Sequence, residues 1–259
     1  MTQLLDHLVA LRDAGRKLLV PYIMGGIPDA QSYPGAVEAI SAEADAIEIG
    51  LPYSDPLMDG PVIAAAAERA IAQGIGPLEA MDMCPPSDSG VARIAMTYYN
   101  PIHHLGERAF CGRLLAAGFH GLIVPDLPLE ESESLRRLAA GAGLAWVPLV
   151  APTSPPPRVR VITATATGFV YAVSSLGVTG TRETLSERAA VVVEACRKET
   201  DLPVLVGIGV STPAHAAQAA AAADGVVIGT AVVRRILEEG ADVARAFLAE
   251  VRASLSASP

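Results

Sequence analysis

The sequence predicts an α/β fold of the (β/α)8 type, a TIM barrel, preceded by one extra N-terminal helix. Eight short runs rich in β-branched and other apolar residues recur along the chain. Most gaps between these runs carry apolar residues at the 3.6-residue spacing of a helix. The length of 259 residues suits eight strand–helix units in a single domain spanning residues 1–259.

The predicted strands are nearly continuous apolar runs, which is typical of parallel strands buried on both faces. They are Leu18–Ile23, Ala46–Ile49, Arg93–Thr97, Gly121–Val124, Ala145–Leu149, Gly168–Ala172, Pro203–Val206 and Gly225–Ile228. An open doubly wound sheet is the alternative. It normally needs fewer units, and no GxGxxG motif follows the first strand here.

Helical periodicity predicts helices at Arg108–Ala117, Leu129–Ala140, Leu185–Lys198 and Pro213–Ala222. The segment Thr2–Ala14 is predicted to form the extra helix, placed so that it covers the bottom of the barrel. A helix that begins near Pro77 should be short, because Met81–Gly90 contains two consecutive prolines and several small polar residues.

Composition excludes several classes of function. The 19 Lys and Arg residues against 28 Asp and Glu residues give a net charge of −9, which is unsuited to binding a nucleic-acid backbone. No apolar run is long enough to suggest a membrane span. The three cysteines form no CxxC pair, and no HExxH motif occurs. We therefore expect a cytoplasmic protein with reduced thiols and no metal site.

Catalytic residues of a barrel lie at the carboxyl ends of its strands. Glu48 stands between Ile47 and Ile49 in the second predicted strand, so alternation turns it away from both isoleucines. A carboxyl group facing the barrel interior loses hydration, which raises its pKa toward neutral pH and suits it to acid–base work. A hydrogen-bonded structural glutamate is the alternative. In the loop that follows, Asp59 and Asp55 are equal candidates for a second functional carboxylate.

Three late strands end in Gly, Ser and Thr residues, which allow a ligand to approach the backbone closely. The segments are Ser174–Thr181, Gly207–Ser211 and Gly229–Thr230, the last of which could start a helix. Barrel phosphate sites are often built from the loops after strands 7 and 8 and a helix N-terminus. The sequence therefore predicts a phosphate site made of backbone N–H groups, which a chain of negative net charge can also provide.

Two further strand ends carry polar residues. Tyr98, Tyr99 and Asn100 follow the third strand, where a tyrosine either lines a pocket or packs under a loop. Asp126 follows the fourth strand and either orients a neighbour or caps the helix expected near Pro128.

Six sequence blocks, found in order along the chain, resemble the tryptophan synthase α subunit family. They are IEIGLPYSDPLMDGP (Ile47–Pro61), MTYYNPI (Met96–Ile102), GLIVPDLPLEE (Gly121–Glu131), GVTG (Gly177–Gly180), VGIGVSTP (Val206–Pro213) and GVVIGTAVV (Gly225–Val233). The first block is long and highly specific to this family.

The resemblance implies a barrel that cleaves indole-3-glycerol phosphate to indole and glyceraldehyde 3-phosphate, a retro-aldol reaction without metal or organic cofactor. It implies that Glu48 is the acid and base, and that Asp59 holds the indole N–H. The remaining substrate-binding positions that it implies are Tyr22, Met96, Tyr98, Ile123, Tyr171, Thr179, Gly180, Ile208, Gly209, Gly229 and Thr230.

The family's partner is a β subunit that carries pyridoxal phosphate (PLP), so the resemblance implies an αββα complex with no PLP on this chain. The loops 52–67 and 174–185 are the ones expected to close over substrate and face the partner. His103 and His104 depart from the family pattern near that surface. A stand-alone lyase that releases free indole is therefore an alternative, and a non-catalytic activator of a β-like partner is a second one.

Overall fold

The computed structural model describes residues 2–85, 90–173, 185–207 and 209–256. Within them, parallel strands form one sheet in the order β5-β4-β3-β2-β1-β9-β8-β7-β6. The strands are β1 (Leu18–Met24), β2 (Ala46–Gly50), β3 (Ala92–Met96), β4 (Gly121–Ile123), β5 (Ala145–Trp146), β6 (Leu149–Val150), β7 (Val170–Val173), β8 (Val204–Gly207) and β9 (Gly225–Ile228).

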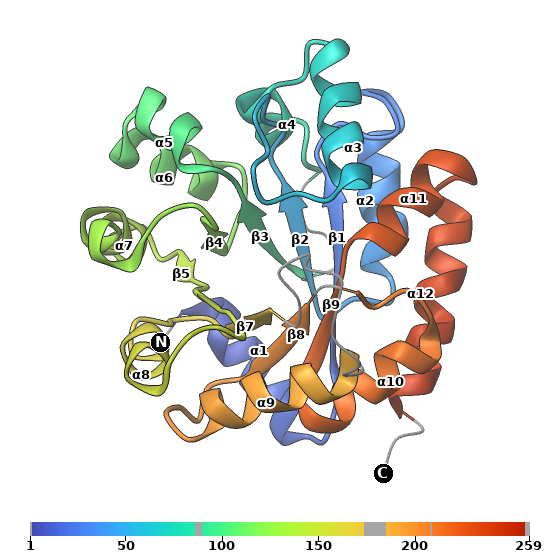
Figure 1. Ribbon diagram of the computed structural model, residues 1–259. Coiled ribbons are helices and arrows are strands. Elements are labelled where there is room, and N and C mark those ends of the chain that lie inside the picture. Colours follow the sequence, from blue (N-terminus) through green and yellow to red (C-terminus); the bar gives the residue numbers. More distant parts are fainter. Residues whose placement is uncertain (1, 86–89, 174–184, 208, 257–259) are drawn as a thin grey trace.

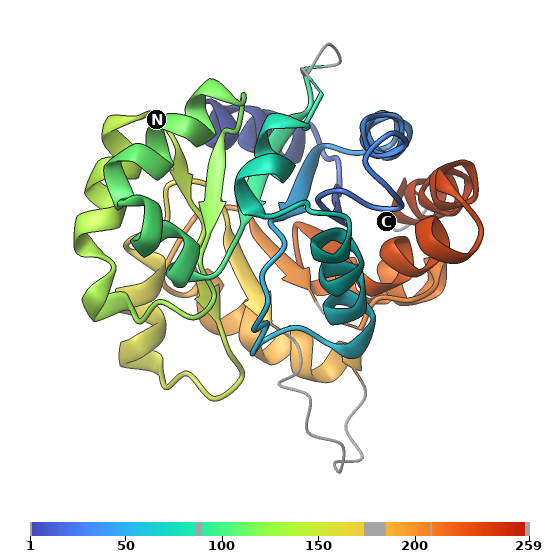
Figure 2. The same ribbon diagram turned by 90° about the horizontal axis from the view of Figure 1, so that it is seen from above.

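Helices surround this curved sheet, as Figure 1 shows. They are α1 (Gln3–Asp13), α2 (Tyr33–Ser41), α3 (Pro61–Ala72), α4 (Pro77–Asp82), α5 (Tyr99–Leu105), α6 (Glu107–Ala116), the 3-10 helix η1 (Leu129–Glu131), α7 (Glu133–Gly141), α8 (Pro156–Thr163), α9 (Leu185–Arg197), α10 (Pro213–Ala222), α11 (Thr230–Glu238) and α12 (Ala241–Ser256). The late helix α12 lies beside the early helix α2, which Figures 1 and 2 both show.

The barrel closes through the chain between β5 and β6. The predicted strand Ala145–Leu149 is divided there, because Pro148 has no N–H group to offer a sheet ladder. Hydrogen bonds nevertheless continue on both sides of the break. The Val147 N–H donates to the Leu122 carbonyl (3.1 Å), and the Tyr171 N–H donates to the Pro148 carbonyl (3.0 Å). The nine recorded segments thus correspond to the eight predicted strands.

Side chains on alternate strand positions fill the inside of the barrel. This interior cluster is aliphatic except for Phe169, and it consists of Leu4, Leu8, Leu18, Val20, Ala46, Ala92, Ile94, Ile123, Ala145, Val147, Phe169, Leu205 and Val227. The intervening strand residues, such as Ile47 and Ile49, belong to the second cluster, between strands and helices. The period of two along each strand therefore separates an inner core from an outer one.

Helix α1 covers the N-terminal ends of the strands, as the sequence predicts. Leu4 and Leu8 are fully buried in the interior cluster. A Cβ atom on Gly121 or Gly168 would lie 3.0 or 3.2 Å from the Leu4 Cδ2 atom, so both glycines make room for this leucine. The extra helix is part of the barrel core.

The helices predicted by residue range agree with the structure, apart from one that is divided. The segment Leu129–Ala140 is divided into η1 and α7 at Ser132. Helix α5 was missed, because its start depends on a residue distant in sequence: the Asp126 carboxylate accepts hydrogen bonds from the Tyr99 N–H (2.9 and 3.1 Å). Pro101 fits within the first turn of α5, where no intrahelical N–H is required.

Cys84, Cys111 and Cys196 are buried and free. Among the described residues, no group of three or more His, Cys, Asp or Glu side chains is arranged to hold a metal ion. No helix in the described ranges is long and apolar enough to cross a membrane.

Replacing Leu4 with alanine tests the role of α1 in the core. We expect a loss of about 2–5 kcal/mol in the free energy of unfolding, because a buried leucine leaves a cavity that its neighbours fill incompletely. Urea denaturation measures this loss. Gln3→Ala, at the exposed neighbouring position of the same helix, is the control and should change stability by less than about 0.5 kcal/mol. Equal stability of the two variants would contradict a core role for α1.

Candidate functional site

Glu48 lies on the inner face of β2. Its strand neighbour of the same parity, Ala46, belongs to the interior cluster, whereas Ile47 and Ile49 pack outward. In the sheet register, Glu48 is paired with Tyr22 of β1 on one side and with Ile94 of β3 on the other. The predicted inward orientation of Glu48 is therefore confirmed.

The Glu48 side chain is almost completely withdrawn from water. The residue is 1% exposed, and within the described part of the chain its Oε2 atom has no hydrogen-bond partner. Burial raises the pKa of Glu48 from 4.5 to about 8, and the nearby Asp59 carboxylate acts in the same direction. At pH 7 the group therefore carries a proton that it can give away.

The two candidate aspartates in the loop after β2 have different surroundings. Asp55 is exposed, and its carboxylate accepts a hydrogen bond from the neighbouring Ser54 hydroxyl (2.6 Å). Asp59 is partly buried. Burial raises its pKa, and a side-chain hydrogen bond with Tyr98 acts in the opposite direction. The structure thus favours Asp59, which the sequence alone could not separate from Asp55.

Tyr98 holds the Asp59 loop in place. Its side chain is 5% exposed, and its Oη atom accepts a hydrogen bond from the Met58 N–H (2.9 Å). The Tyr53 ring packs against the Tyr98 ring, with 5.4 Å between their centroids. Burial raises the pKa of Tyr98 to about 12, so the phenol stays protonated and can donate to Asp59.

Two tyrosines flank Glu48, and each lies across a glycine of the next strand. A Cβ atom on Gly50 would lie 1.9 Å from the Tyr22 Oη, and one on Gly207 would lie 2.1 Å from the Tyr171 Oη. Only glycine fits at either position. Burial raises the pKa of both tyrosines well above 10.0, and Glu48 contributes to the shift in each case. Sequence reasoning missed Gly50, although a glycine inside a strand is itself a signal of close approach.

The other implied pocket residues are distributed over the neighbouring strands. Met96 is paired with Gly50 at the carboxyl end of β3, and Ile123 is fully buried at the end of β4. Thr179, Gly180 and Ile208 lie outside the described residues. Ile123 belongs to the interior cluster, and Met96 packs against that cluster.

The predicted phosphate site is described in part. Gly229 is the N-cap of α11, and Thr230 is the first residue of that helix. Gly209, after β8, has a φ of +90°, which favours glycine over any other residue. A helix N-terminus offers unpaired N–H groups and a partial positive charge to an anion. The carboxyl ends of β8 and β9 therefore carry backbone elements that suit an anion site.

Asp126 orients a neighbouring segment, which is the first of the two roles expected for it. Its carboxylate accepts both hydrogen bonds from the Tyr99 N–H, the first of helix α5, and does not cap the helix near Pro128. It thereby fixes the turn that carries the adjacent Tyr98.

Replacing Glu48 with glutamine should make the protein relatively more stable as the pH rises. The folded state holds the Glu48 proton up to about pH 8, whereas the unfolded chain releases it near pH 4.5, so folding of the wild type weakens across that interval. Glutamine carries no such penalty. The gap in stability should widen by at most about 1.4 kcal/mol per pH unit. Urea denaturation of both proteins from pH 4 to pH 9 measures it, and a gap that is constant with pH would contradict the raised pKa.

Replacing Tyr98 with phenylalanine should loosen the loop that carries Asp59. The Met58 N–H loses its acceptor, at a cost of about 1 kcal/mol, so protease cleavage at the exposed Leu57 and Met58 should become roughly fivefold faster. Tyr99→Phe is the control, because the Tyr99 hydroxyl binds Glu107 and leaves the loop untouched. Limited proteolysis at equal rates in all three proteins would show that Tyr98 does not hold the loop.

The chain is similar to known proteins over nearly its whole length. A family model described as tryptophan synthase alpha chain matches residues 8–257. The tryptophan synthase alpha chain of Microcystis aeruginosa is 43% identical over 242 residues, 92% of each chain, and that of Rippkaea orientalis is 42% identical over 263 residues, 98% of each chain. A solved structure of Mycobacterium tuberculosis tryptophan synthase superposes with a TM-score of 0.89 at 38% identity and covers 98% of both chains. With a match over nearly its whole length and the same fold, the chain belongs to the tryptophan synthase alpha chain family.

Proposed function

We propose that this chain cleaves indole-3-glycerol phosphate to indole and glyceraldehyde 3-phosphate, as the α subunit of a tryptophan synthase. The observation that carries the proposal is the protonated Glu48 carboxyl group inside the barrel, with Asp59 near it on the β2–α3 loop. A retro-aldol cleavage needs one group that donates a proton to the ring carbon and accepts one from the side-chain hydroxyl.

Glu48 supplies both proton transfers. Its neutral form donates a proton to the indole carbon that bears the glycerol phosphate, which turns the ring into a cationic electron acceptor. The resulting carboxylate takes the proton of the adjacent glycerol hydroxyl as the carbon–carbon bond breaks. The bond electrons return to the ring and the hydroxyl becomes the aldehyde, so Glu48 ends the cycle protonated. A pKa of about 8 suits both halves of this cycle at neutral pH.

The Asp59 carboxylate accepts a hydrogen bond from the indole N–H group and stabilises the positive charge that the protonated ring develops. Its position supports this role, because Tyr98 directs the loop inward and Asp59 lies close enough to Glu48 to raise its pKa. The charge on Asp59 thus serves twice, since it holds the ring and keeps Glu48 protonated.

The substrate phosphate binds at the late strand ends. We assign it to backbone N–H groups at Gly209, Gly229 and Thr230, together with Thr179 and Gly180. The indole ring lies among Tyr22, Met96, Tyr98, Ile123, Tyr171 and Ile208. This arrangement explains how a chain with a net charge of −9 can accept an anionic substrate.

The family works with a β subunit, and we propose that this chain does so in an αββα complex in which the PLP belongs to the partner. Leu57 and Met58 support a protein contact at the Asp59 loop, because their side chains are 86% and 54% exposed. We further propose that residues 1–259 form one domain and act in the cytoplasm. The reaction needs no cofactor on this chain.

Steady-state cleavage assays on three variants test the assignment of the carboxyl groups. Glu48→Gln should lower turnover roughly a thousandfold, because it removes both proton transfers. Asp59→Asn should lower turnover roughly a hundredfold through lost charge stabilisation. Asp55→Asn is the matched control on the same loop and should retain near-wild-type turnover. Similar losses in the Asp55 and Asp59 variants would contradict the assignment.

The same assay with and without a β subunit separates the functional alternatives. Strong activation by β supports the α-subunit role. High turnover by the chain alone identifies a stand-alone lyase, and no saturable cleavage in either condition identifies a non-catalytic activator.

A further inference from the structure

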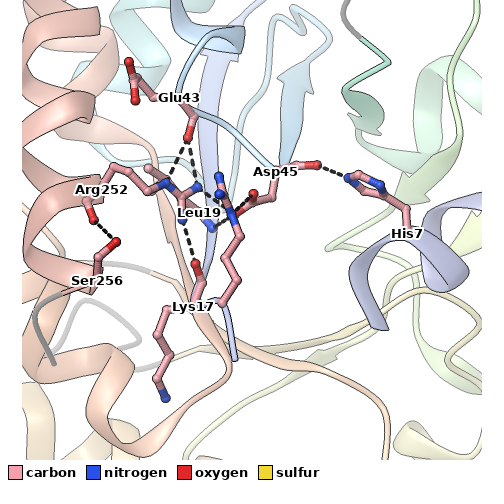
Figure 3. A network of polar contacts seen from close by, with 8 residues as sticks. His7, Lys17, Leu19, Glu43, Asp45, Arg252 and Ser256 are labelled. Atoms are coloured by element: carbon pink, nitrogen blue, oxygen red, sulfur yellow. Dashed lines mark hydrogen bonds and ion pairs between the residues drawn. The ribbon is translucent and has the colours of Figure 1, made fainter. Parts of the chain in front are cut away.

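Asp45 is the centre of a polar network at the N-terminal end of β2, shown in Figure 3. Its side chain is 2% exposed. The Oδ1 atom accepts a hydrogen bond from Arg16 Nε (2.7 Å). The Oδ2 atom accepts one from Arg252 Nη2 (2.6 Å) and one from the Leu19 N–H (2.8 Å). One buried carboxylate therefore joins β1, β2 and the C-terminal helix α12.

Arg252 donates hydrogen bonds to backbone carbonyl groups that lie just before β1 and just before β2. Its Nη1 donates to the Lys17 carbonyl (2.7 Å), directly before β1. Its Nε and Nη2 donate to the Glu43 carbonyl (3.3 and 2.9 Å), shortly before β2. The planar fork of a guanidinium reaches these carbonyls and Asp45 together, which the single ammonium of a lysine cannot do.

Elements from both ends of the sequence meet at Asp45. The His7 ring of α1 forms a hydrogen bond with the Asp45 carbonyl through Nε2 (3.0 Å), and Arg252 comes from α12. Helix α12 lies against α2, the helix that leads into β2 (Figure 2). The network therefore lies between α1, which covers the barrel base, and the C-terminal helix α12.

The network lies at the start of the β1–β2 pairing, and β2 carries Glu48. The Asp45 N–H donates to the Leu19 carbonyl (2.9 Å), while the Asp45 carboxylate accepts from the Leu19 N–H (2.8 Å). Three residues further along each strand are Tyr22 and Glu48, which are themselves register partners. Since a strand rises about 3.3 Å per residue, the network lies roughly 10 Å from Glu48 along a continuous buried strand.

We propose that Arg252 and Asp45 are positioning residues that hold Glu48 in its buried place opposite Tyr22. The inference rests on the proposed function for its catalytic meaning. The burial of Glu48 does not depend on that function and can be measured separately. Buried ion pairs often contribute little net stability, and register is the better attested use of such groups. Here the pair fixes the β1–β2 register from a helix that lies outside the barrel.

Arg252→Lys tests the proposal, because it keeps the charge and loses the fork. A loosened β1–β2 pair admits water to Glu48, so the pKa of Glu48 should fall toward its ordinary range. Cleavage turnover should drop roughly tenfold, with KM nearly unchanged, because small misplacements of a catalytic group are costly. The pH at which kcat declines should move to lower values by the same amount as the pKa.

A second measurement needs no substrate. The stability change caused by Glu48→Gln is recorded against pH in the wild-type and Arg252→Lys backgrounds. The midpoint of that change should shift to lower pH in the lysine background by about half a unit or more. If Arg252→Lys does not fold, Asp45→Asn replaces it, since the amide oxygen can still accept from Leu19 while the charge is lost. It should show the same direction of shift.

Arg245→Lys, at an exposed position of the same helix, is the control and should leave kcat, its pH profile and the midpoint unchanged. A variant that melts at a lower temperature but keeps the wild-type kcat, pH profile and midpoint would overturn the proposal and leave Arg252 a purely structural residue. If the wild type does not cleave the substrate at all, the proposed function fails, and the midpoint alone decides whether Arg252 positions Glu48.

Discussion

The dehydration of one carboxyl group governs the chemistry of this barrel. Glu48 lies in an interior built almost wholly from aliphatic side chains, with 1% of its surface exposed. Removing a carboxylate from water costs more than removing the neutral acid, so the group keeps its proton at neutral pH. The barrel thereby provides an acid from an ordinary glutamate. Several other features of the site preserve that dryness.

Features that preserve the dryness come from opposite ends of the strands. Below Glu48, helix α1 inserts Leu4 and Leu8 into the base of the barrel. Above it, Tyr98 secures the loop that carries Asp59. Beside it, Gly50 gives the Tyr22 ring room to lie across the neighbouring strand. These contacts join residues that are distant in sequence, and all of them surround the same carboxyl group.

Much of this could be predicted from the sequence, because strand alternation and apolar periodicity are local signals. They identified the parallel barrel, the extra helix and the inward orientation of Glu48. Local signals could not choose between Asp55 and Asp59, since the choice depends on the position of Tyr98 at the end of the neighbouring strand β3. Helix α5 and the division of β5 from β6 were missed for different reasons: Asp126 starts the helix from a distant loop, and Pro148 interrupts the ladder within a run that looks continuous. Hydrogen bonds between residues distant in sequence decided the choice of Asp59 and the start of α5, whereas the break at Pro148 comes from the missing N–H of one residue.

The barrel interior keeps Glu48 protonated near neutral pH. An NMR titration that follows the side-chain carboxyl carbon of Glu48, assigned by comparison with the Glu48→Gln protein, measures this directly. We expect a single titration with a pKa of about 8. A value near 4.5, the ordinary pKa of a glutamate, would contradict it and would leave the site without its acid.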